Sequence, residues 1–211
     1  MRKELIINKS KTIIVILAGG QSRRFGGGYK TLYTFNKISI LDRIIQNFKK
    51  LEVEIVLNVN SNEDQFLKTG LHLIKDELEN FQGPLAGICS SMKWVLENRK
   101  NIEWIFTSPS DTPFLNKNLV NKFLSTDYNN KTKIVIAKSS NKTHPVIGFW
   151  HISLIKSLEE FLAKENRKIM HWVEGQNYEI LNFENKNNFF NINTKTDLEE
   201  AIKIEESLKT L

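Results

Sequence analysis

Short apolar runs alternate with amphipathic segments along almost the whole chain. The apolar runs have the length of buried strands, and the segments between them repeat apolar residues at helical spacing. This alternation predicts βαβ units around a mostly parallel sheet, which is an α/β fold. The predicted strands cover residues 12–18, 54–60, 71–76, 104–111, 133–137 and 144–151, and the predicted helices cover residues 40–51, 83–98, 116–126, 153–166, 167–175 and 194–208.

Several helix ends carry their own signals. Pro84 is tolerated at a helix start, and Asn116 suits an N-cap. Thr194 and Asp197 have the spacing of a capping box at the start of the last helix. Because no linker or internal repeat interrupts the pattern, we expect a single domain over residues 1–211.

The positive charge is concentrated at the start of the chain. Residues 1–50 contain eleven Lys and Arg against two acidic residues, a net charge of +9, which leaves −3 for the remainder of a chain whose total is +6. The patterns of dedicated nucleic-acid binders are missing, so a small anionic ligand is favoured. Alternatively, residues 1–11 form a solvated basic tail, which would account for part of this charge.

Composition limits the compartment and the chemistry. A single cysteine, Cys89, excludes an internal disulfide, and the four histidines are too scattered for zinc spacing. No apolar run approaches the roughly 20 residues that a membrane span needs. We therefore expect a folded cytoplasmic protein, with 40% hydrophobic residues to build its core and with no membrane or nucleic-acid partner.

Polar residues follow the predicted parallel strands. Asn58 ends the second strand, Asp76 ends the third, Asp111 lies just past the next, and a glycine-rich loop follows the first. Ligands of open parallel sheets bind beyond the carboxyl ends of the strands. We therefore expect these residues to converge on one binding site.

The glycine-rich loop is the stretch ILAGGQSRRFGGGYK, residues 16–30, with five glycines and three cations. Glycines let backbone N–H groups approach anionic oxygens, and the cations balance their charge. The Walker pattern fails because Tyr29 precedes Lys30, and the dinucleotide pattern fails from Gly19 onward. The alternative to a phosphate loop is a glycine-rich surface turn with incidental cations.

The spacing L-A-G-G-x-x-x-R-x-G-G-G-x-K after the first strand resembles the signature of nucleotidyltransferases. The stretches GPLAGICSSM (83–92), SPSDTPFL (108–115) and NINTKTDLEEA (191–201) narrow the resemblance to the molybdenum cofactor guanylyltransferases. The resemblance covers roughly residues 12–205 and implies a Rossmann-like three-layer nucleotidyltransferase fold with a mostly parallel central sheet.

That resemblance implies a reaction in which the terminal phosphate of molybdopterin, with or without bound molybdate, attacks the α-phosphorus of GTP. GMP is transferred, pyrophosphate leaves, and Mg²⁺ is the implied cofactor. The family positions implied as catalytic are Arg24, Lys30 and Asp111, with Asp111 as the metal ligand. The positions implied as nucleotide contacts are Leu17, Ala18, Gly19, Gly20, Lys30, Asn58, Asp76, Asp111, Asn191 and Asn193.

Candidates in the second half of the chain are less specific. Asn191 and Asn193 alternate in NIN, so on a short strand both side chains would face the site. Their implied contacts are the nucleotide, the metal or the acceptor phosphate, and an amide favours orientation of phosphate or metal-bound water. His144 and Pro145 are candidates for pterin recognition. Arg167 is a candidate contact of the acceptor phosphate, and the start of a surface helix accounts for it equally well.

Two other functions stay open at this point. Cytidylyltransferases and sugar-phosphate nucleotidyltransferases share the loop but commonly have alanines where this chain has Gly19 and Gly20. A catalytically silent nucleotide-binding module could instead dock on molybdoenzymes or their chaperones. The double glycine and the retained cations favour a guanylyltransferase, although Tyr29 replaces the family's usual aspartate.

Overall fold

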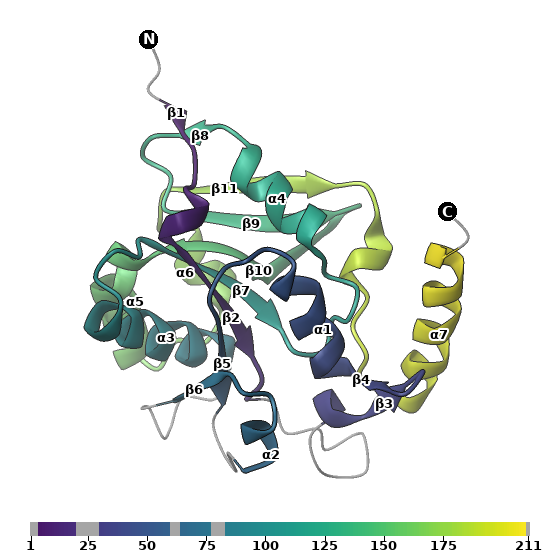
Figure 1. The fold of residues 1–211 in the computed structure, drawn as a ribbon. Coiled ribbons are helices and arrows are strands. Elements are labelled where there is room, and N and C mark those ends of the chain that lie inside the picture. Colours follow the sequence, from purple (N-terminus) through teal and green to yellow (C-terminus); the bar gives the residue numbers. More distant parts are fainter. Residues whose placement is uncertain (1–3, 20–29, 60–63, 77–82, 210–211) are drawn as a thin grey trace.

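A computed structural model describes residues 4–19, 30–59, 64–76 and 83–209 of the protein around a seven-stranded sheet (Figure 1). The strand order is β11-β9-β10-β7-β2-β5-β6, and neighbouring strands are parallel except where β10 is one of the pair. The predicted mostly parallel sheet is confirmed. Its strands are β2 (Thr12–Leu17), β5 (Ile55–Val59), β6 (His72–Lys75), β7 (Trp104–Pro109), β9 (Ile134–Ser139), β10 (Lys142–His151) and β11 (Tyr178–Phe183).

Helices cover both faces of the sheet, so the predicted three-layer α/β fold is confirmed (Figure 1). The core of one face includes residues of α1 (Ile40–Lys49), α4 (Lys117–Ser125) and α7 (Lys195–Lys209), and the core of the other includes residues of α3 (Pro84–Asn98), α5 (Ile155–Ala163) and α6 (Ile169–Val173). Within the described residues, no helix has both the length and the apolar character needed to cross a membrane.

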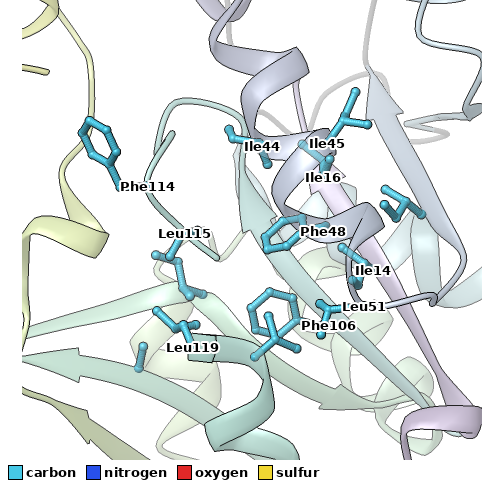
Figure 2. Close-up of a cluster of buried hydrophobic side chains, with 14 of the residues drawn as sticks. Ile14, Ile16, Ile44, Ile45, Phe48, Leu51, Phe106, Phe114, Leu115 and Leu119 are labelled. Atoms are coloured by element: carbon cyan, nitrogen blue, oxygen red, sulfur yellow. The ribbon is translucent and has the colours of Figure 1, made fainter. Parts of the chain in front are cut away.

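Strand β2 contributes to both cores. Its four central side chains have no exposed surface and alternate between the faces, with Ile13 and Val15 on the α3 side and Ile14 and Ile16 on the α1 side. Figure 2 shows Ile14 and Ile16 near Phe48, whose ring meets that of Phe106 edge-on at 6.0 Å between centroids. Burial of a side chain of this size contributes about 1.5–3 kcal/mol, so β2 is held firmly on both sides.

Strand β10 runs against its neighbours and is irregular near its start. Its pairing with β9 slips between His144 and Gly148, so that residues 145–147 bulge from the sheet. Gly148 is needed there, because a Cβ would lie 2.2 Å from a backbone carbonyl of β9. The Thr107 hydroxyl donates to the carbonyl of Val146 at 2.7 Å and holds the bulge against β7.

The helix-end signals are confirmed. Asn116 accepts hydrogen bonds from the N–H groups of residues 118 and 119. Thr194 and Asp197 form the reciprocal bonds of a capping box, with N–H to side-chain oxygen distances of 3.1 and 2.8 Å. The apolar pattern missed β11, because this edge strand is half exposed and carries polar residues between its apolar ones.

The prediction of a solvated tail over residues 1–11 is wrong in part, because Leu5 and Ile7 pack against the core, whereas Lys9 is exposed. β1 (Glu4–Leu5) pairs antiparallel with β8 (Tyr128–Asn129), and Ile7 is 1% exposed. Lys11 forms an ion pair with Glu103. The physical reason is that apolar residues between the cations bury against the main core, which a solvated tail cannot do.

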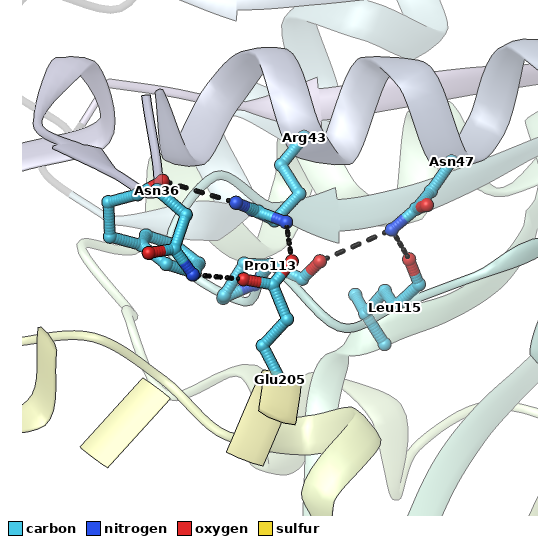
Figure 3. A network of polar contacts seen from close by, with 7 residues as sticks. Asn36, Arg43, Asn47, Pro113, Leu115 and Glu205 are labelled. Carbon is cyan, nitrogen blue, oxygen red and sulfur yellow. Dashed lines mark hydrogen bonds and ion pairs between the residues drawn. The ribbon is translucent and has the colours of Figure 1, made fainter. Parts of the chain in front are cut away.

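Helix α7 is tied to α1 by a polar network (Figure 3). Arg43 of α1 forms an ion pair with Glu205 of α7, and Asn36 donates to the same carboxylate at 2.6 Å. Arg43 also donates to the carbonyl of Phe35 at 3.2 Å. The side chains of Arg43 and Glu205 are only 13% and 14% exposed, so solvent screens the pair weakly.

Replacing Glu205 by Gln should lower the free energy of unfolding by about 3 kcal/mol, because it leaves the Arg43 guanidinium buried without its counter-charge. Urea unfolding measures the change. The matched control is Glu200→Gln, which removes an exposed partner of Lys203 and should change stability by less than about 1 kcal/mol. Equal losses in the two variants would contradict the role given to the buried pair.

Candidate functional site

Backbone hydrogen bonds join the carboxyl ends of β2, β5 and β7. The N–H of Ala18 donates to the carbonyl of Asn58 at 2.8 Å, and the N–H of Ser110 donates to the carbonyl of Leu17 at 3.1 Å. The residues that leave these strands therefore start from one rigid edge.

A cavity of about 410 Å³ opens along this edge. This volume lies in the range of small-molecule sites. Six of the residues predicted as nucleotide contacts line the cavity, namely Leu17, Gly19, Asn58, Asp76, Asp111 and Asn191. Further lining comes from Gly83, Pro84, Pro109 and residues 142–147 at the start of β10.

Asn58 holds Asp76 in the cavity wall. Asn58 is 2% exposed, and its Nδ2 donates to Asp76 Oδ1 at 2.7 Å and to the carbonyl of Ile74 at 3.3 Å. Burial raises the pKa of Asp76, and the hydrogen bond from Asn58 opposes that rise. The Asp76 carboxylate is thus a hydrogen-bond acceptor held at a fixed position in the cavity wall.

Gly87 allows α3 to pack directly behind this wall. A Cβ at this position would lie 2.2 Å from Asn58 Oδ1 and 3.0 Å from Leu17 Cδ2. Gly87, the second glycine of GPLAG, therefore lets the first turn of α3 pack closely against Asn58 and Leu17. The sequence pattern did not predict this contact.

Asp111 lies in the loop between β7 and α4, and the chain before α7 holds this loop. The N–H of Ile192 donates to the Asp111 carbonyl at 2.9 Å, and the Thr112 hydroxyl donates to Asn191 Oδ1 at 2.7 Å. Thr112 and Asn191 are 79 positions apart in the sequence, and their contact places the Asp111 loop beside Asn191 in the cavity wall.

The Asp111 carboxylate suits Mg²⁺, which prefers hard oxygen ligands and commonly uses one or two carboxylates together with substrate phosphates. Among the residues that the structure describes, no group of three or more His, Cys, Asp or Glu side chains could hold a metal. The chemistry of the Asp111 carboxylate fits a magnesium ion that would take its other ligands from substrate phosphates and water.

The expectation for Asn193 is wrong in its geometry. Residues 191–193 lie outside the strands, because the N–H of Ile192 bonds to the Asp111 loop rather than to a neighbouring strand. Asn193 is exposed, does not line the cavity, and uses its N–H to donate to Asp197 Oδ2 at 2.7 Å. Asn191 alone of the two asparagines lies in the cavity wall.

The remaining predicted residues belong to the glycine-rich loop and its flanks. Ala18 is buried and does not line the cavity. Gly20 and Arg24 lie outside the described residues, and Lys30 begins the short helix η3 (Lys30–Leu32). Their suggested contacts with a nucleotide therefore stay predictions.

Most of the cavity wall formed by β10 was not predicted from the sequence. Of the pterin and acceptor-phosphate candidates, His144 and Pro145 line the cavity, whereas Arg167 is exposed and does not. Lys142 was not predicted and adds a positive charge to the wall. An antiparallel strand starts at the edge of the sheet where its parallel neighbours end, so the first residues of β10 lie at the cavity. Recognising β10 as antiparallel would therefore have pointed to these residues.

His144 is fixed in this wall. Its Nε2 lies 2.8 Å from Ser139 Oγ, and its ring stacks on Phe189 with 4.4 Å between centroids. Burial, with a smaller contribution from the charge of Lys142, lowers the pKa of His144 to about 4. His144 is therefore a neutral hydrogen-bonding group at neutral pH.

Comparison with known proteins adds to this geometry. Residues 14–179 match the family model of the MobA-like NTP transferase domain. A molybdenum cofactor guanylyltransferase from Nitrobacter hamburgensis is 36% identical over 193 residues, which cover 90% of this chain and 92% of that protein. The chain belongs to the molybdenum cofactor guanylyltransferase family. The resemblance inferred from the motifs is confirmed, including its assignment to the nucleotidyltransferases.

Other members and neighbours of this family agree. The molybdenum cofactor guanylyltransferase of Haemophilus influenzae strain Rd is 34% identical over 189 residues, covering 89% of this chain and 96% of that protein. The crystal structure of molybdopterin-guanine dinucleotide biosynthesis protein A from Archaeoglobus fulgidus has a TM-score of 0.71 and 19% identity, over 94% of this chain and all of that chain. At that identity the structure supports the fold alone.

The His144 ring should stay neutral when the pH falls from about 8 to about 5, since its pKa lies at about 4 rather than at its ordinary 6.5. NMR shifts of the ring, assigned with a His144→Gln variant, report its protonation. In the unfolded chain the His144 ring binds a proton at about pH 6.5, whereas in the folded protein it does so only at about pH 4. His144 should therefore lower the free energy of unfolding as the pH falls from about 6.5 to about 4. A titration midpoint near 6.5 would contradict the assignment.

Proposed function

We propose that this protein transfers GMP from GTP to molybdopterin, with or without bound molybdate, and releases pyrophosphate. The observation that carries the proposal is one cavity that has Asp76 and Asn58 in one part of its wall and Asp111 and Asn191 in another. Membership of the molybdenum cofactor guanylyltransferase family supports the same reaction.

The nucleotide would lie across the end of β2. A guanine ring presents N1–H and N2–H₂ donors, and the Asp76 carboxylate is a fixed acceptor for them. The double glycine at Gly19 and Gly20 lets the backbone approach the nucleotide. Arg24 and Lys30 are proposed to neutralise the triphosphate, Arg24 with its planar donor fork and Lys30 as a point charge.

Asp111 is proposed to bind Mg²⁺ together with the phosphates. When bound, this ion would neutralise charge on the triphosphate and on the leaving pyrophosphate. The chain's own contribution is positioning, because the Asp111 loop is fixed by hydrogen bonds to the segment before α7. An in-line displacement needs such positioning and electrostatic stabilisation, and it needs no covalent intermediate on the protein.

The acceptor would lie against the start of β10. Lys142 can pair with the acceptor phosphate, while the neutral His144 and the rigid Pro145 offer a surface for the pterin. Asn191 is proposed to orient phosphate or metal-bound water. The exposed Asn193 would act only indirectly, through the start of α7 that it helps to form.

The partners and the location belong to the same proposal. GTP and molybdopterin are the proposed substrates, and molybdoenzymes or their chaperones are proposed to receive the product, because a dinucleotide cofactor acts only within another protein. The single cysteine is consistent with a reducing, cytoplasmic location.

Purified protein with Mg²⁺, GTP and molybdopterin should form the guanine dinucleotide and pyrophosphate, and GTP should support this reaction better than CTP. Asp111→Asn should lower kcat at least about 100-fold, because it removes the proposed metal carboxylate. Mass spectrometry of the product gives the result. Bound GTP without pyrophosphate release would instead favour a silent nucleotide-binding module.

Lys30→Gln and Lys37→Gln form a matched pair for the same assay. Lys37 is exposed and lies in the turn between β3 (Thr34–Phe35) and β4 (Ile38–Ser39). Its φ of 67° is equally uncommon for lysine and for glutamine, so the substitution adds no backbone strain. Only Lys30→Gln should abolish most of the turnover. Comparable losses in the two variants would show that a diffuse positive field, rather than one placed cation, supports the reaction.

Asp76→Asn should change the nucleotide preference from GTP to xanthosine triphosphate. Asn58 donates to Asp76 Oδ1 at 2.7 Å, so the amide oxygen of the substituted side chain should keep this position. Its NH₂ group then points into the cavity, where it can donate to the C2 carbonyl of xanthine but not to the C2 amino group of guanine. The expected loss of kcat/KM for GTP is about 10–100-fold, as for a lost hydrogen bond to a charged group.

The control for this prediction is Asp64→Asn at the start of α2 (Asp64–Leu67), which is exposed and does not line the cavity. It should leave the preference for GTP unchanged. If Asp76→Asn lowered the use of both nucleotides equally, Asp76 would be a structural residue and not the group that recognises the base.

A further inference from the structure

Side chains from two directions hold the loop that carries Asp111. From α1, Asn47 Nδ2 donates to the carbonyl of Pro113 at 3.2 Å and to that of Leu115 at 3.0 Å (Figure 3). From the chain before α7, Asn191 meets Thr112 in the same loop. The first contact fixes the backbone of the loop, whereas the second joins it to a side chain of the cavity wall.

Thr112 lies between two polar residues of the cavity. It is 0% exposed, and its hydroxyl donates to Asn191 Oδ1 at 2.7 Å, with Asp111 Oδ1 as a second acceptor at 3.2 Å. A hydroxyl has a single proton, so the shorter contact is the main hydrogen bond. With Oδ1 of Asn191 engaged in this way, Nδ2 is the end of the amide that can donate to a ligand.

We propose that Thr112 is a positioning residue that fixes the Asn191 amide beside Asp111, so that Asn191 donates its N–H groups to a phosphate oxygen of the substrate. This inference rests on the proposed function for its substrate. The orientation of the Asn191 amide by Thr112 can be tested in the protein alone, because the hydrogen bond between them needs no ligand.

The buried position of Thr112 gives a reason for this role. Removal of a buried donor leaves its acceptor unsatisfied, and groups that orient the residues of a metal or phosphate site commonly affect activity 10–100-fold. Valine has the shape of threonine without the hydroxyl, and serine keeps the hydroxyl without the methyl group. The two variants separate hydrogen bonding from packing.

Thr112→Val should lower kcat about 10–100-fold, while Thr112→Ser should stay within about threefold of the parent protein. In the ligand-free protein, Thr112→Val should also shift the ¹⁵N NMR signals of the Asn191 side-chain amide, which Asn191→Ala identifies by their loss. Thr112→Cys, a much weaker donor, takes the place of Thr112→Val if the latter does not fold.

The matched control is Thr12→Val. Thr12 is 4% exposed and donates to the carbonyl of Asn8 at 3.0 Å, at the opposite end of β2 from the cavity. The Thr12→Val variant should have the same kcat and the same Asn191 side-chain NMR signals as the parent protein. Normal turnover of Thr112→Val, unchanged Asn191 signals, or a loss in Thr112→Ser as large as that in Thr112→Val would each overturn the inference.

Failure of the inference can be told from failure of the proposed function. If the parent protein forms no dinucleotide, the proposed function fails, and the NMR comparison still decides whether Thr112 fixes Asn191. If the parent protein is active and Asp111→Asn is not, while Thr112→Val matches the parent protein, the proposed function stands and the inference falls.

Discussion

Burial of β2 between two layers of helices is the interaction on which the site depends. The side chains of Ile13 to Ile16 have no exposed surface, and β2 also pairs in parallel with β5 and β7. A strand held on both faces and both edges has little freedom to move. The residues at its carboxyl end, Leu17 and Gly19, therefore give the cavity a fixed floor against which flanking loops are positioned.

The reversed strand β10 gives the cavity a second kind of wall. A purely parallel sheet would bring only strand ends and the loops after them to this edge. Because β10 runs in the opposite direction and bulges at residues 145–147, it adds side chains from the strand itself. Lys142 and the neutral His144 in this wall differ in charge from the carboxylates Asp76 and Asp111, which suits a cavity that takes two different substrates.

The fold and the contacts inside the cavity contribute differently to the site. The Archaeoglobus fulgidus structure shows the same fold at 19% identity, whereas the relative at 36% identity carries the family assignment. Within the shared fold, individual side-chain hydrogen bonds orient the polar groups of the cavity. Asn58 fixes the Asp76 carboxylate, and Thr112 meets Asn191, so each cavity group named here is held by a buried neighbour.

The sequence by itself determined the order and type of most elements, because strand and helix periodicities are local properties. It also determined that Asn58, Asp76 and Asp111 converge, since parallel strands end at one edge. Only the tertiary structure decided that Asn191 meets the Asp111 loop while Asn193 is exposed, and that residues 142–147 complete the cavity. Those outcomes depend on contacts between segments far apart in the chain, which no local pattern of residues specifies.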